Sequence, residues 1–144
     1  MANDDTCRLL GECDAGIQMA VSAIDEVLPM VESFQLRQQL TQCRRAHEQL
    51  RTEAHKLLNR YDGVGKSPNP VAKGMSWMKT NLKLAFQPGD QSVADLMIDG
   101  CNMGVKSLHK YCNRYPDATA EAQNLAGRLI REEQRLQQNL QSYL

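Results

Sequence analysis

Apolar residues recur at alternating steps of three and four along most of the chain, which is the spacing of helices with one buried face. The first series follows the capping oxygens of Asn3–Thr6, and its helix is predicted to end near Pro29, which lacks an amide hydrogen. Its buried face is predicted to contain Leu10, Cys13, Ile17, Ala20, Ile24, Val27 and Val31.

A second series of the same period runs from about Ser33, the predicted N-cap, to Tyr61. Its apolar face includes one histidine, so the pattern places His47 in the core and not on the surface. The predicted face contains Leu36, Leu40, Cys43, His47, Leu50, Ala54, Leu57 and Tyr61.

Glycines and prolines in Asp62–Pro70 predict a loop, and Gly65-Lys66-Ser67 within it is too short a match for a phosphate-binding loop. A short helix is predicted next, from about Val71 to Phe86. It is expected to cover one side of the bundle, and the alternative is a docking surface for a membrane or a partner. Its apolar residues are Met75, Trp77, Met78, Leu82, Ala85 and Phe86, and Lys73, Lys79 and Lys83 oppose them.

Two further helices follow the turn at Gln87–Asp90, one starting near Gln91 and one capped by Asp117 and extending almost to Leu144. Their predicted buried positions are Ala94, Met97, Cys101, Val105, Leu108 and Cys112, then Ala122, Ala126, Leu129, Glu133, Leu136, Leu140 and Tyr143. No useful alternation of period two occurs. The fold is therefore predicted to be all-α: residues 1–144 form one four-helix bundle of two antiparallel helical hairpins joined by a crossover with a short extra helix.

The charge balance and the cysteines narrow the class of protein. Lys and Arg number 17 and Asp and Glu number 17, so no bulk charge attracts nucleic acid or an anionic membrane. Five cysteines without a C-x-x-C pair argue against a disulfide framework, and no apolar run approaches the ~18 residues of a membrane span. With no apolar signal segment, a soluble cytoplasmic protein is expected.

Each predicted hairpin carries one copy of a short motif, Cys13-Asp14-Ala15-Gly16-Ile17 and Cys101-Asn102-Met103-Gly104-Val105. With two hairpins and a long connection, this motif resembles the ferritin-like superfamily, and most closely small bacterial ferritin-like bundles. In metal-binding members, the first and third helices each supply a Glu, and the second and fourth each supply an E-x-x-H pair.

Several of those ligands are missing here. Ile17 and Val105 occupy the positions that the resemblance assigns to the two carboxylates. Glu133 could be one retained acid, but Leu136 stands where its histidine would be, and no E-x-x-H precedes His47. The resemblance therefore implies a degenerate metal site, with no stoichiometric iron and no ferroxidase activity.

Turn geometry places Ile17 opposite His47 and Val105 opposite Glu133, so one layer is predicted to contain all four. A charged Glu133 in the core is expected to become protonated or to find a partner, and His47 is the obvious one. If the two touch, the pair is a structural hydrogen bond or the remnant of a catalytic dyad. Alternatively, Cys43, His47, Cys101 and Glu133 could bind a single zinc or iron ion. His55 and His109 have no acidic or cysteine partner at helical spacing and are predicted to be surface histidines or satisfied ones.

These observations favour a non-catalytic structural or protein-interaction role, for example in bacterial stress or spores; the alternative is a metal-binding or redox protein. A nucleophilic Cys43 is disfavoured because its predicted seam with His47 is closed and has no evident cleft. Dispersed basic residues argue against nucleic acid. Apolar residues beyond one seam, Leu9, Met19, Leu28, Trp77 and Leu84, predict a protein partner or a homodimer.

Overall fold

The computed structural model describes residues 2–61, 63 and 89–144, and within these ranges it contains four long α-helices and no strand. The helices are α1 (Ala2–Val27), α2 (Phe34–Arg60), α6 (Asp90–Arg114) and α7 (Ala120–Leu140); short 3₁₀ turns, η1 (Leu28–Met30) and η2 (Gln141–Tyr143), follow α1 and α7. The all-α prediction is confirmed for this part of the chain. The helix predicted over Val71–Phe86 lies outside the described residues.

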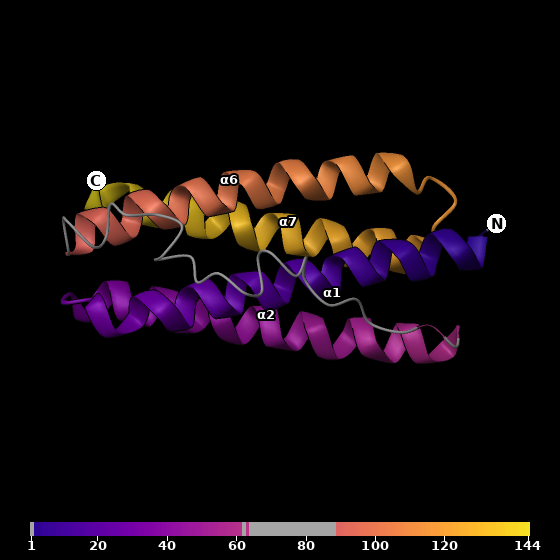
Figure 1. Cartoon of the computed structure of the whole chain (residues 1–144), viewed down its shortest axis with the longest axis horizontal. Helices are drawn as coiled ribbons and strands as arrows, with labels where there is room; N and C mark the ends of the chain where they lie inside the picture. The colour runs from indigo at the N-terminus through magenta and orange to yellow at the C-terminus, as the bar shows by residue number, and fades with distance from the viewer. Residues whose placement is uncertain (1, 62, 64–88) are drawn as a thin grey trace.

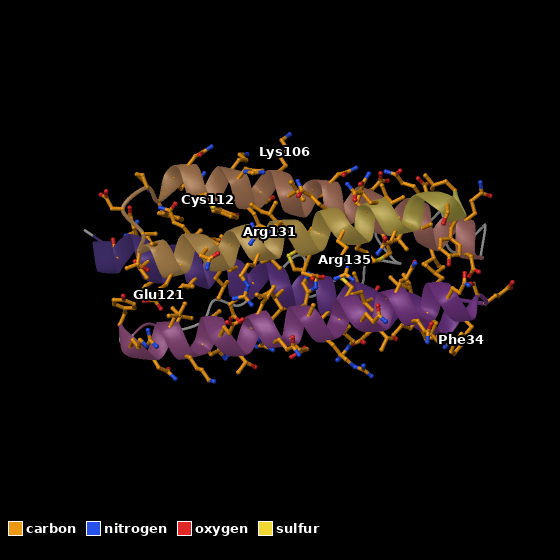
Figure 2. All side chains as sticks on the ribbon, turned by 180° about the vertical axis from the view of Figure 1, so that it is seen from behind. Phe34, Lys106, Cys112, Glu121, Arg131 and Arg135 are labelled. Carbon is orange, nitrogen blue, oxygen red and sulfur yellow. The ribbon has the colours of Figure 1, made fainter. Side chains whose placement is uncertain are left out.

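In Figure 1, α1 lies along α2 and α6 lies along α7, and the two pairs are stacked on each other. The α1–α2 turn and the start of α6 lie at one end of the bundle, and the α6–α7 turn and the N-terminus lie at the other. Charged side chains such as Lys106, Arg131 and Glu121 project from the outer faces (Figure 2). The apolar faces of the helices meet between the two pairs.

The helix boundaries differ from the prediction at two N-termini. α1 already begins at Ala2, before the predicted capping residues. The N-cap of α7 is Thr119 and not Asp117, because the Thr119 hydroxyl accepts a hydrogen bond from the amide of Ala122 at 3.3 Å. The Ser33 cap is confirmed by the equivalent bond, from Leu36 N to Ser33 Oγ at 3.3 Å.

A side chain near the start of α6 bonds to the α1–α2 turn, and a side chain near the start of α1 bonds to the α6–α7 turn. Both carboxylate oxygens of Asp90, at the start of α6, accept backbone amides of the α1–α2 turn, from Glu32 at 2.8 Å and Ser33 at 2.9 Å. At the opposite end, Thr6 Oγ1 accepts the amide of Thr119 at 2.9 Å. Side chains therefore satisfy amides that the helix ends leave unpaired, and they fix both ends of the bundle.

The core consists of two apolar clusters along the bundle axis. The cluster near the α1–α2 turn contains Ala23, Ile24, Val27, Val31, Leu36, Leu40, Cys43, Val93, Ala94, Leu96, Met97, Ile98, Cys101, Leu136 and Leu140. The cluster near the α6–α7 turn contains Leu9, Leu10, Cys13, Ile17, Leu50, Ala54, Leu58, Leu108, Ala118, Ala122, Leu125, Ala126, Leu129 and Ile130. His47 and Glu133 belong to neither cluster and lie, in sequence, between members of the two.

Most predicted seam positions are buried, and the exceptions have a geometric cause. At the end of α2, Leu58 is buried while the predicted Leu57 is half-buried. Tyr61, Val105, Cys112 and Tyr143 are also half-buried, and Ala20 is half-buried because it faces a gap between α1 and α6. A straight helix has 3.6 residues per turn, so a face predicted with steps averaging 3.5 residues drifts sideways over a long helix.

Asp90→Ala is expected to lower the free energy of unfolding by about 1–2 kcal/mol, because two backbone amides lose a charged acceptor. Urea unfolding of the two proteins measures this difference. Asp99→Ala, which removes an exposed acid from the same helix, is the matched control and should change stability by less than about 0.5 kcal/mol. Equal losses in both variants would show that the Asp90 bonds contribute nothing specific.

Candidate functional site

A hydrogen bond between two buried ionisable side chains crosses the bundle from α2 to α7. His47 Nε2 lies 2.7 Å from Glu133 Oε1, with His47 1% and Glu133 8% exposed. The predicted pair is therefore in contact. The distance is short for a nitrogen and an oxygen, which is typical of a bond with an ionised partner.

The second ring nitrogen of His47 determines the proton count of this pair. Nδ1 lies 2.8 Å from the carbonyl oxygen of Cys43, one turn earlier on α2. A carbonyl can only accept, so Nδ1 carries a hydrogen, and one further proton lies between Nε2 and the carboxylate. The pair is neutral overall wherever that proton sits, which is why the core tolerates it.

Electrostatics favour the form in which His47 is protonated. Burial lowers the pKa of the imidazole, but the hydrogen bonds with Cys43 and Glu133 outweigh burial and raise the pKa from 6.5 to about 11. His47 is therefore an imidazolium at neutral pH, and Glu133 is its carboxylate counter-ion. Both ring nitrogens are donors in this form, so neither has a lone pair for a metal or a proton.

Two cysteines lie beside this layer, Cys43 and Cys101. Cys43 Sγ lies 3.4 Å from His47 Nδ1. The pKa of Cys101 is raised by burial, then by the nearby Glu133 and Cys43 and by a hydrogen bond to Glu133. In the second cluster, burial and then Cys112 raise the pKa of Cys13 to about 12. Thiols in such surroundings are poor nucleophiles, because the thiolate is the reactive form.

The four suggested metal ligands contact one another in a chain: Cys43 touches His47, His47 bonds to Glu133, and Cys101 bonds to Glu133. In the described part of the chain, no three His, Cys, Asp or Glu side chains are grouped so that they could hold one ion. Ile17 is fully buried in the cluster near the α6–α7 turn, and Val105 packs against the same cluster. The two positions that the resemblance assigns to carboxylates thus contribute hydrocarbon.

The glycines of the two motif copies have different surroundings. A Cβ atom on Gly104 would lie 3.4 Å from Glu133 Oε2, so this glycine lets the carboxylate lie against the backbone of α6. A Cβ atom on Gly16 would have no atom of the described residues within 4 Å. Gly104 therefore faces the buried acid, whereas Gly16 faces open space. The sequence motif alone did not distinguish them.

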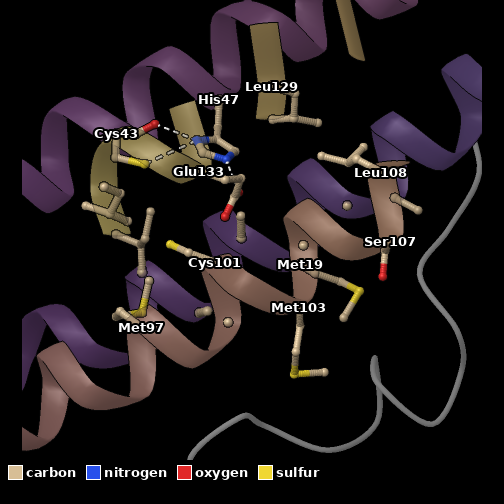
Figure 3. A pocket seen from close by; sticks show the side chains of 18 of the residues that line it. Met19, Cys43, His47, Met97, Cys101, Met103, Ser107, Leu108, Leu129 and Glu133 are labelled. Atoms are coloured by element: carbon tan, nitrogen blue, oxygen red, sulfur yellow. Dashed lines mark hydrogen bonds and ion pairs between the residues drawn. The ribbon is translucent and has the colours of Figure 1, made fainter. Parts of the chain in front are cut away.

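The open space beside Gly16 is a cleft of about 550 Å³ between α1 and α6, and the polar layer lies at its floor (Figure 3). The prediction that Cys43 and His47 lie on a closed seam is therefore wrong, since both line this cleft. The gap exists because small residues on both helices face it. These residues are Ala15, Gly16, Ala20 and Ala23 on α1 and Gly100, Gly104 and Ser107 on α6.

Two methionines lie at the mouth of the cleft, on the side away from His47 in Figure 3. Met19 on α1 is 44% exposed and Met103 on α6 is 67% exposed. Unbranched thioether side chains adapt to different partner shapes and are frequent on protein surfaces that bind helices. Of Leu9, Met19 and Leu28, which were predicted to lie outside the seam, only Met19 is exposed. The prediction is wrong for Leu9, which is fully buried in the core cluster near the α6–α7 turn, and Leu28 packs against the other cluster.

A second polar cluster between α1 and α2 involves one of the histidines predicted to have no acidic partner at helical spacing. The buried carboxylate of Asp14 accepts hydrogen bonds from His55 Nε2 at 2.8 Å, Arg51 Nε at 3.0 Å and Gln18 Nε2 at 3.0 Å. Helical spacing could not identify Asp14 as the partner of His55, because the acid lies on another helix. His109 is exposed, as predicted.

Comparison of the chain with protein-family models, with curated proteins and with solved structures finds no match. The helices of the described ranges include none that is long and apolar enough to cross a bilayer.

Replacing His47 with Leu is expected to cost about 3–5 kcal/mol, because Glu133 is left as a buried charge without its partner. Replacing both residues, with His47→Leu and Glu133→Met, should cost clearly less than the sum of the two single replacements. Urea unfolding of the four proteins gives the coupling energy. Additive losses would show that the pair is not a unit, and loss of a bound metal at unchanged melting temperature would identify a metal site.

Stability should also depend on pH through His47. Its pKa is higher in the folded protein than in the unfolded chain, so its stabilising effect is complete below about pH 6.5 and declines as the pH rises towards 11. The stability difference between wild type and His47→Leu should therefore shrink from pH 7 to pH 10, by up to ~1.4 kcal/mol per pH unit. Urea unfolding at each pH tests this, and parallel pH profiles would contradict it.

Proposed function

We propose that this chain is a non-catalytic protein-interaction module, in which the cleft between α1 and α6 binds an amphipathic helix of a partner protein. We further propose that its four helices form a ferritin-like bundle of two antiparallel hairpins, with the His47–Glu133 pair in place of a metal layer. The observation that supports binding is the cleft itself, a largely apolar space of about 550 Å³ beside α1 and α6.

The polar groups at the cleft floor are hydrogen-bonded to one another, which favours a non-catalytic role. Both nitrogens of His47 are hydrogen-bonded, and the raised pKa of Cys101 keeps its thiol protonated. A nucleophile or general base needs a free lone pair at working pH. The layer instead resembles the buried polar pairs that fix helix register.

The shape of the cleft suits a helix better than a compact ligand. Its lining extends along α1 from Glu12 to Ile24 and along α6 from Met97 to Tyr111, so it is about 18 Å long at 1.5 Å per residue. This is the length of roughly three helical turns. Small residues on both walls leave room for one row of bulky side chains, in the manner of a helix that inserts its apolar face into a groove.

A library of helical peptides displayed on phage and selected against the whole protein tests this function. Selected peptides should bind wild type and lose at least roughly 10-fold in affinity for Gly16→Leu, which places a large side chain in the cleft. Gly16→Leu should fold well, since a Cβ atom there meets no described atom within 4 Å and glycine is unfavourable within helices. Fluorescence polarisation measures the affinities.

Ser22→Leu is the matched control, because Ser22 is exposed on the same helix and does not line the cleft. Its affinity for the peptides should equal that of wild type. Failure to select any peptide, or equal binding to Gly16→Leu, would contradict the proposal. Light scattering on the free protein addresses the predicted homodimer: a dimer that Gly16→Leu dissociates would make a second copy the occupant.

A further inference from the structure

We infer that the cleft selects a basic helix, whose Lys or Arg side chain reaches the Glu133 carboxylate at the cleft floor. This inference rests on the proposed function and adds the chemistry of the partner. It starts from the charges in the cleft lining: among the described residues that form it, two are acids, Glu12 and Glu133, and none is Lys or Arg. The one cation of the lining, the His47 imidazolium, lies behind Glu133 and leaves a net negative charge.

The carboxylate of Glu133 has one strong donor and capacity for more. Oε1 is bonded to His47 Nε2, and the further donor is the thiol of Cys101, which is a weak one. A carboxylate has about four lone-pair sites, and charged donors form its strongest bonds. An ammonium or guanidinium group would therefore add a second charged donor, stronger than the Cys101 thiol.

The negative end of the buried pair is accessible from the cleft. Oε2 lies where a Cβ atom on Gly104 would be 3.4 Å away, and Gly104 is itself part of the cleft wall. In Figure 3, Glu133 lies between His47 and Cys101, with the imidazolium on the far side from Met19 and Met103. A partner side chain entering past the methionines thus meets the carboxylate before it meets His47.

The walls also suit a long basic side chain. Met97, Leu108 and Leu129 line the cleft with hydrocarbon. Lys and Arg place their methylene stems along such surfaces while the charged group reaches a polar partner. An acidic or a purely apolar side chain at the same point would leave Glu133 facing a like charge or no donor.

The peptide selection described above tests this inference by sequence. Selected helices should share a Lys or Arg at one position, flanked by apolar residues at helical spacing. Replacing that Lys with norleucine, or that Arg with an uncharged residue of similar length, should weaken binding to wild type roughly 10-fold or more. The same replacement should change the affinity for Glu133→Gln less than about 3-fold.

Gly104→Ala provides a second readout if Glu133→Gln does not fold. Its methyl group lies in ordinary van der Waals contact with Glu133 Oε2, so the variant should fold and the methyl group should shield this oxygen. Replacing the basic residue of the peptide should then again change the affinity little. If peptides bind, are blocked by Gly16→Leu and carry no shared basic residue, this inference is wrong and the proposed function stands. If no peptide is selected, both fail.

One further result would overturn the choice of occupant. This result is that the full chain fails to bind peptides that bind strongly once residues 64–88 are replaced with a Gly/Ser linker. In that case the chain's own connection, with Lys73, Lys79 and Lys83, would be the basic segment that Glu133 accepts. The cleft would then be an intramolecular site and not a partner site.

Discussion

The core of the bundle tolerates His47 and Glu133 because the two side chains share one proton and are neutral as a pair. Because the Cys43 carbonyl requires a hydrogen on Nδ1, the pair holds a single further proton and remains neutral in the core. This requirement determines much of the surrounding sequence: a glycine at position 104 that lets the carboxylate approach α6, and a protonated thiol at Cys101 beside it. It also places a polar layer between the two apolar clusters, and its hydrogen bond opposes sliding of one helix pair along the other.

Register along the bundle is therefore set at three levels. Asp90 holds the α1–α2 turn, Thr6 holds the α6–α7 turn, and the His47–Glu133 pair joins α2 to α7 between them. All of these contacts pair an atom in one helical pair with an atom in the other. Apolar packing alone specifies register weakly, because similar side chains can exchange places along a seam. Directional bonds at the ends and in the middle remove that freedom.

The polar layer and the cleft are two consequences of the same arrangement. The proposed loss of metal ligands leaves a self-satisfied ion pair at the floor, and small residues on α1 and α6 leave room above it. A bundle with hydrocarbon at Ile17 and Val105 has little means of holding a dication, but it retains a carboxylate in an apolar cleft. Such a carboxylate is suited to recognition by a charged donor more than to chemistry.

The sequence by itself determined the helices, the buried position of His47 and the contact between His47 and Glu133. The helices and the burial of His47 follow from a period of 3.6 residues, which is a property of one helix. The expectation that Glu133 lies at the height of His47 also used the positions of the two turns, one in each helix pair. Only the tertiary structure decided that Thr119 caps α7, that Asp14 binds His55, and that α1 and α6 leave a cleft. The choice between two possible caps, the pairing of side chains across α1 and α2 and the width of the gap between α1 and α6 all depend on how the helices pack, which the period of one helix does not specify. The apolar pattern shows which face of a helix is buried, but small side chains on a buried face can mean either close contact or an open gap.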